Sequence, residues 1–144
     1  MNAPIFGTKT FGFKTPLPPG RHIVNAARAF AGHPFMSAPD RAACFDCVTL
    51  ISALTGEDIS VDWVRKGGRL PFIPLALDTA LPGDLLVLMD CDHWLMAVMT
   101  EGFGIDDPRA RIFTVRRCRA AAEVWLTPTL KDSLISAYQL PVKG

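Results

Sequence analysis

Hydrophobic side chains between residues 47 and 54 recur at the spacing of one helical face. Asp46 is a good N-cap for this segment, because its carboxylate can accept a hydrogen bond from a free amide of the first turn. Gly56 can end the helix in a left-handed conformation. The pattern therefore predicts a short helix that begins at Cys47. The positions that share its buried face are Cys47, Leu50, Ile51 and Leu54.

Two further segments carry helix signals, one near each end of the chain. From Arg21 to Ala31, apolar side chains recur at helical spacing, and the Gly32 that follows ends the run. Near the other end, the pair Thr127-Pro128 has the form of an N-cap followed by a proline at the first helical position. This pair predicts a helix that continues to about Tyr138.

Strands are predicted mainly in the second half of the chain, after the strong turn signal Pro82-Gly83-Asp84. Residues 57–68 fit a strand or a helical turn, and residues 70–80 fit a connection or one short helix. Two helices followed by an antiparallel meander and a C-terminal helix predict an α+β fold. The expected strands are Leu85 to Met89, His93 to Thr100, Phe103 to Asp106 and Arg111 to Arg117.

Composition limits the organisation and the partners of the chain. At 144 residues and 49% hydrophobic content it can form one domain with a substantial core. We assign residues 21–144 to that domain, and the proline-rich residues 1–20 to an extended arm that lies on it. A net charge of +1 gives no reason to expect a nucleic acid or a membrane as partner.

The length of the apolar runs and the composition of the first residues bear on the expected localisation of the protein. No run approaches the ~18 residues of a membrane helix. The segment after Met1 lacks a basic stretch followed by an apolar one, so no secretory signal is visible and we expect cytoplasmic synthesis. In that compartment the 4 cysteines are expected to remain reduced.

Cys47 is the first residue with candidate chemistry. A thiol at a helix N-terminus faces the positive end of the macrodipole and several free amides, which stabilise the thiolate and lower the pKa. A cysteine of this kind can act as a nucleophile. The alternative is a small core residue, because unpaired cysteine is among the most buried residue types.

His93 and the acids that follow it are the candidate partners of this thiol. His93 opens a predicted strand, where its ring can face a helix N-terminus and form a thiolate–imidazolium pair. Asp106 and Asp107 lie at the end of the next predicted strand, so cross-strand pairing can bring one of them beside the histidine as the third member of a triad. The alternatives are an ordinary histidine and a plain turn before Pro108.

The order of these pieces resembles the NlpC-type papain-like cysteine peptidases of bacterial cell walls. In that family a first helix ends in Gly-x-Pro-Tyr, the nucleophile lies in Asp-Cys-Ser-Gly-Leu, and Pro-Gly-Asp-Leu opens the strand before the base histidine. Here Val48-Thr49 replaces the usual Ser-Gly. The matching pieces are Arg21 to Arg28, Gly32-His33-Pro34-Phe35, Phe45-Asp46-Cys47, Pro82-Gly83-Asp84-Leu85-Leu86 and His93.

The resemblance implies a papain-like hydrolase without a cofactor. Cys47 matches the nucleophile, His93 the base and Asp106 the third position. Phe35 stands where the family usually has a tyrosine that helps the oxyanion site, so the amide of Cys47 is the donor we can name, and Phe35 and Asp46 flank the substrate. The implied reaction is cleavage of an amide bond in peptidoglycan stem peptides. Small members of this kind resemble the tail-associated peptidases of phages and gene-transfer particles, with a toxin-secretion effector as the alternative, and both imply delivery by a non-Sec route.

Three other interpretations come from the same residues. Cys44, Cys47, Cys91 and His93 have the ligand types of a structural zinc site. The first half, Cys44-x-x-Cys47, also has the form of a dithiol redox motif. The third interpretation is a papain-like fold that binds a ligand without catalysis.

A group of arginines follows the predicted triad. These side chains can hold an anionic ligand, such as the carboxylates of a stem peptide, or form a solvated strand face. The group consists of Arg109, Arg111, Arg116, Arg117 and Arg119.

Overall fold

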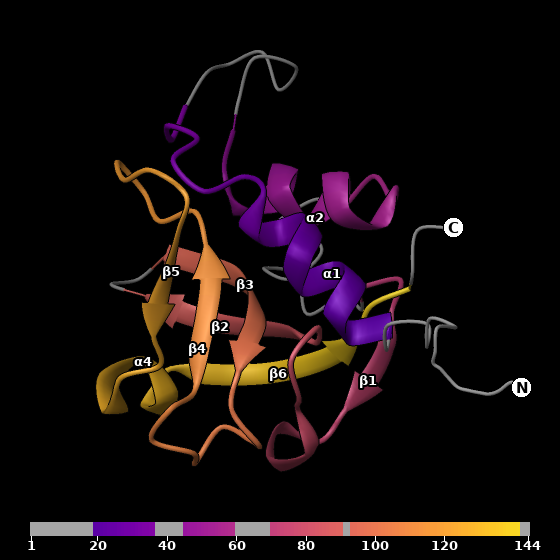
Figure 1. Cartoon of the computed structure of the whole chain (residues 1–144), viewed down its shortest axis with the longest axis vertical. Coiled ribbons are helices and arrows are strands. Elements are labelled where there is room, and N and C mark those ends of the chain that lie inside the picture. Colours follow the sequence, from indigo (N-terminus) through magenta and orange to yellow (C-terminus); the bar gives the residue numbers. More distant parts are fainter. Residues whose placement is uncertain (1–18, 37–44, 60–69, 91–92, 142–144) are drawn as a thin grey trace, which may run out of the picture.

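The computed structural model describes residues 19–36, 45–59, 70–90 and 93–141. Within these ranges the chain forms helices and a six-stranded antiparallel sheet, which confirms the α+β class (Figure 1). Most of the arm predicted at residues 1–20, most of the ambiguous segment 57–68, and both Cys44 and Cys91 lie outside the described residues.

The chain begins with two helices, as predicted, and the sheet follows. Helices α1 (Pro19–Arg28) and α2 (Cys47–Thr55) contact each other and β3, whereas α4 (Pro128–Asp132) lies beyond the end of β5 (Figure 1). A 3₁₀ turn, η2 (Leu77–Thr79), precedes β2. The strand order in the sheet is β1-β6-β2-β3-β4-β5. The strands are β1 (Ile73–Leu75), β2 (Leu85–Asp90), β3 (His93–Glu101), β4 (Arg111–Thr114), β5 (Ala122–Trp125) and β6 (Leu134–Gln139).

The two central strands form the middle of the hydrophobic core. Leu85 to Leu88 on β2 and Leu95 to Thr100 on β3 are buried without interruption. Successive side chains of a strand point to opposite faces, so a continuous buried run means that both faces of the sheet are covered here. None of the helices formed by the described residues is long and apolar enough to span a membrane.

The predicted C-terminal helix is wrong after its first turn. The N-cap is confirmed, because the amide of Leu130 donates to the hydroxyl of Thr127 (3.3 Å). The helix, however, ends at Asp132, and β6 takes the following residues into the sheet between β1 and β2. Pairing on both sides of β6 outweighs the weak helical preference of the segment.

The strand predicted at Phe103 to Asp106 is also wrong. Residues 102–110 form turns that connect β3 to β4, and Asp107 fixes them through hydrogen bonds from the amides of Phe103 and Arg109, both 2.9 Å. The next predicted strand is confirmed in part, because β4 ends at Thr114 instead of Arg117. Strands β1 and β5 were not predicted.

The turn before β2 holds the start of α1 against the sheet. The amide of Gly83 donates to the carbonyl of Met99 on β3 (2.7 Å), and Gly83 has a φ of 97°. Its Cα faces Gly20 so closely that a Cβ on either glycine would collide with the backbone of the other segment. Glycine at both positions therefore allows α1 to approach the sheet.

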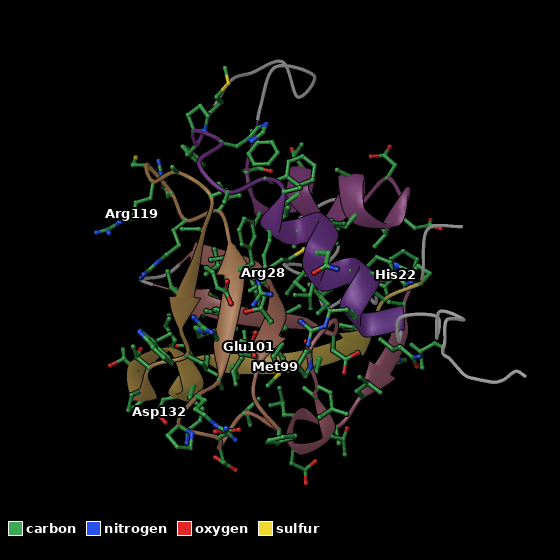
Figure 2. All side chains as sticks on the ribbon, in the orientation of Figure 1. His22, Arg28, Met99, Glu101, Arg119 and Asp132 are labelled. Carbon is green, nitrogen blue, oxygen red and sulfur yellow. The ribbon has the colours of Figure 1, made fainter. Side chains whose placement is uncertain are left out.

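Arg28 links the end of α1 to two strands. Its guanidinium donates to Glu123 on β5 through Nε (3.0 Å) and Nη2 (2.8 Å), and to Glu101 on β3 through Nη2 (2.7 Å). Figure 2 shows Arg28 and Glu101 side by side beneath α1. The hydroxyl of Thr100 also donates to Glu123 (2.6 Å). The hydrogen bonds from Arg28 lower the pKa of Glu123, so the carboxylate remains charged at neutral pH.

The close contact between Gly83 and Gly20 predicts that alanine destabilises the fold more at Gly83 than at Gly32, although both glycines have a positive φ. Gly83→Ala meets both a positive φ and the backbone of Gly20, whereas Gly32→Ala meets only a positive φ of 89°, with nothing within 4 Å. We expect Gly32→Ala to cost roughly 1–2 kcal/mol of unfolding free energy, and Gly83→Ala to cost more. Urea denaturation followed by circular dichroism measures both. Equal losses would contradict the close approach.

Candidate functional site

The start of α2 has the geometry that the sequence predicts. The carboxylate of Asp46 accepts hydrogen bonds from the amide of Thr49 (2.9 Å) and from its hydroxyl (3.1 Å). At the other end Gly56 has a φ of 76° and its amide donates to Ser52 (2.8 Å). These two caps fix the helix ends, so that Cys47 is the first helical residue.

The thiol of Cys47 is buried where α2 packs on β3. The residue is 7% exposed. Its sulfur accepts a hydrogen bond from the amide of Met96 at 3.4 Å. This contact joins the helix N-terminus to the middle of the second central strand.

The pKa of the Cys47 thiol is raised, whereas the sequence predicts a lowered pKa. Burial raises the pKa of Cys47 to about 11, and the negative charge of Asp46 adds to this effect. The amides of Met96, Cys47 and Val48 act in the opposite direction without offsetting burial. In the described part of the chain, desolvation of the thiolate therefore outweighs its stabilisation by the helix N-terminus.

His93 lies on the strand that contacts the thiol. It is the first residue of β3, where its backbone pairs with Asp90, and it precedes Met96 by three residues. Its side chain lies outside the described part of the structure. The backbone thus brings His93 and Cys47 to neighbouring elements, and the imidazole–thiol pair remains a prediction.

Asp106 is placed elsewhere, which corrects the predicted third member of the triad. Its carboxylate accepts a hydrogen bond from Lys131 of α4 at 2.9 Å and is 82% exposed. The turns that contain it follow the far end of β3, and Figure 1 shows them at the opposite side of the molecule from α2. The misplaced strand at residues 103–106 was the source of this prediction. Asp107 caps the same turns, as the sequence also allowed.

The rings of Phe30, His33 and Phe45 pack together just before the start of α2. Residues 36 and 45 are joined by a backbone hydrogen bond from Met36 to Phe45 (3.0 Å). The ring of His33 lies 4.9 Å from that of Phe45 and 5.3 Å from that of Phe30. Phe35 packs partly buried against the core. Because phenylalanine has no hydroxyl, its side chain cannot donate a hydrogen bond to an oxyanion.

Two features of the site were not predicted, the amide of Met96 and the buried hydroxyl of Thr114. The first is a backbone group, and no side-chain pattern identifies it. Thr114 donates to the carbonyl of Met96 at 2.7 Å. It sits inside a predicted strand without any spacing that connects it to Cys47.

The zinc and redox interpretations depend on residues outside the described ranges. Among the described residues, no group of three or more histidine, cysteine, aspartate or glutamate side chains could hold a metal ion. Cys44, required by both interpretations, and Cys91, required by zinc, lie outside those ranges. Cys47 itself is a free, buried thiol, and Cys118 is free and exposed.

Arg109 and Arg111 are among the arginines of this group that contact neighbouring side chains. Arg109 contacts Asp107 and lies 5.3 Å from the centre of the Phe103 ring. Arg111 pairs with Glu123 and lies over the ring of Trp125 at 5.1 Å. Arg119 is exposed and points away from the body of the molecule (Figure 2). These placements favour a structural and solvated role over a single anion site.

The α+β fold resembles that of a solved structure described as belonging to the NLP/P60 family. No family profile and no curated protein sequence matches the chain. The structure is similar to the crystal structure of a Staphylococcus aureus subsp. aureus Mu50 protein described as similar to lipoprotein, NLP/P60 family. The TM-score is 0.51 at 20% identity, covering 91% of this chain and 45% of the other. The chain thus spans less than half of that protein, and the similarity shows the fold.

The placement of the two acids predicts that neither one acts on the thiol. Asp106→Ala should leave both the melting temperature and the alkylation rate of Cys47 close to wild type, because an exposed ion pair contributes little. Asp107→Ala should lower the melting temperature, since two amides of the turn lose their acceptor, and should also leave the alkylation rate unchanged. Thermal melting and peptide-resolved iodoacetamide labelling measure the two properties. Slower labelling of Cys47 in Asp106→Ala alone would restore its role in the triad.

Proposed function

We propose that the chain is a cysteine peptidase or amidase that cleaves an amide bond in peptidoglycan stem peptides. The observation that carries the proposal is the Cys47 thiol at the N-terminus of α2, hydrogen-bonded to the β3 strand that begins with His93. The NlpC/P60-like fold supports the choice of substrate class. A nucleophile at a helix start with a base on the adjoining strand is an arrangement suited to acyl transfer.

In the proposed reaction, His93 takes the proton of the Cys47 thiol and the thiolate attacks the scissile carbonyl carbon. The new carbon–sulfur bond forms as the carbonyl oxygen becomes an oxyanion, which the amide of Cys47 stabilises. The oxyanion then collapses, the carbon–nitrogen bond breaks, and the imidazolium gives its proton to the leaving amine. Water hydrolyses the thioester with His93 again as base, which restores the thiol.

For this reaction to proceed, the imidazole of His93 must lower the pKa of the Cys47 thiol, which burial raises. A neighbouring imidazolium favours the thiolate, and burial strengthens their attraction. The proposal uses a Cys–His pair and does not include Asp106, whose carboxylate pairs with Lys131.

The route to the substrate is part of the same proposal. The sequence resemblance favours a peptidase carried by the tail of a phage or of a gene-transfer particle, and a toxin-secretion effector is the alternative. Localising the chain in purified particles by immunoelectron microscopy distinguishes these two carriers.

A non-catalytic binding module is the second candidate function. The observation that favours it is the enclosed thiol, 7% exposed with a raised pKa. Such a module would bind the same stem peptides and leave them intact.

The first prediction from the proposed function concerns the identity of the nucleophile. Cys47→Ala should abolish the release of cleaved stem peptides from purified peptidoglycan, because no other group forms the thioester. Cys44→Ser and the exposed Cys118→Ser should retain most of the activity. Mass spectrometry of the digested muropeptides measures the products and identifies the bond. Equal loss in Cys44→Ser, with stoichiometric zinc in the purified protein, would favour the metal site.

The second prediction concerns the pH dependence of the thiol. Pairing with His93 should give wild-type Cys47 an alkylation midpoint below the ~8.5 of a free cysteine. His93→Ala should move the midpoint upward, because burial then raises the pKa of the thiol without an opposing imidazolium. His33→Ala is the matched control, because this ring packs on Phe30 and Phe45. A wild-type midpoint already near 11 would support the binding module.

A further inference from the structure

Two buried hydrogen bonds meet on the backbone of Met96. Its amide donates to the sulfur of Cys47 at 3.4 Å, and its carbonyl accepts from the hydroxyl of Thr114 at 2.7 Å. Met96 is 0% exposed and Thr114 is 2% exposed. Both bonds therefore form away from bulk water, where the loss of one partner is costly.

The strand geometry explains why one residue receives both groups. The amide and the carbonyl of Met99 bond to Asp84 (2.9 Å) and Gly83 (2.7 Å), on the side of β2. Because successive residues of a strand direct these groups to alternate sides, those of Met96 are directed toward β4. The thiol and the hydroxyl thus approach the same edge of β3.

Thr114 occupies a particular place in the pairing of the two strands. It is the last residue of β4, and its pairing with Ala97 is the last in the β3–β4 register. Its side chain reaches one residue further along β3, to Met96. The hydroxyl therefore adds one hydrogen bond between β4 and β3 beyond their last backbone pair, at Met96, whose amide contacts the thiol.

We propose that Thr114 is a positioning residue for the Cys47 thiol, holding the Met96 backbone so that its amide stays directed at the sulfur. A hydrogen bond from an amide becomes charge-assisted when the thiol ionises, and is then stronger. Thr114 consequently favours the thiolate without touching the thiol or the substrate. Its significance for catalysis rests on the proposed function, whereas its effect on the thiol does not.

The test compares the alkylation of Cys47 in variants that change one hydroxyl. Thr114→Val removes the donor at nearly constant volume, and Thr114→Ser keeps it. The matched control is Thr55→Val, because the buried hydroxyl of Thr55 likewise donates to a carbonyl, that of Ile51 at 2.8 Å, at the other end of α2. Peptide-resolved mass spectrometry follows iodoacetamide labelling of Cys47 from pH 6 to pH 11, with thermal melting in parallel.

Thr114→Val should label Cys47 roughly fivefold more slowly below the midpoint, with a higher midpoint, which corresponds to about 1 kcal/mol lost from the charge-assisted bond. Thr114→Ser and Thr55→Val should follow the wild-type profile. A wild-type profile for Thr114→Val, or an equal shift in Thr55→Val, would overturn the proposal. If Thr114→Val does not fold, the test is made on the wild-type protein by NMR. The chemical shift of the Met96 amide must then change as Cys47 titrates, and a shift that does not change would also overturn the proposal.

The outcome is separable from that of the proposed function. Wild-type protein that fails to cleave peptidoglycan, with slower labelling in Thr114→Val, would refute the peptidase and retain the positioning role. Wild-type protein that cleaves peptidoglycan, with unchanged labelling of Cys47 in Thr114→Val, would retain the peptidase and refute the positioning role.

Discussion

The contact between the start of α2 and β3 is the constraint on which the candidate site depends. Asp46 fixes where the helix begins, and the sulfur of the next residue meets the amide of Met96 at 3.4 Å. The strand can offer this amide only because β2 and β4 hold β3 in register on both sides. The position of one thiol therefore depends on pairings between residues distant in sequence as well as on a local helix cap.

The same contact creates two opposing effects on ionisation. A helix N-terminus and a directed amide favour the thiolate, whereas enclosure by apolar side chains disfavours it. Without a counter-charge, burial prevails and the pKa of Cys47 rises. A fold of this kind can serve a reactive thiol or a structural one, and in the proposed function the charge of the predicted partner His93 decides between them.

The parts of the fold that local signals specify could be predicted from the sequence. The caps at Asp46, Gly56 and Thr127 act within one or two turns, so their residues suffice to place helix ends. Segment 134–139 could not be predicted, because its state depends on pairing with β1 and β2. The error at Asp106 has the same origin, since a misplaced strand put its carboxylate beside His93. The place of Cys47 at the start of a helix could be predicted because its signal is local. The hydrogen bond from Thr114 to Met96 could not, because it depends on the backbone of another strand.

The link from Arg28 to the sheet has a consequence for folding kinetics. Its partners lie 73 and 95 residues away along the chain, so these bonds can form only after most of the sheet has assembled. Interactions that form late are absent from the transition state for folding and act mainly on the rate of unfolding. Arg28 would then govern how long the native state persists, with little influence on how quickly it is reached.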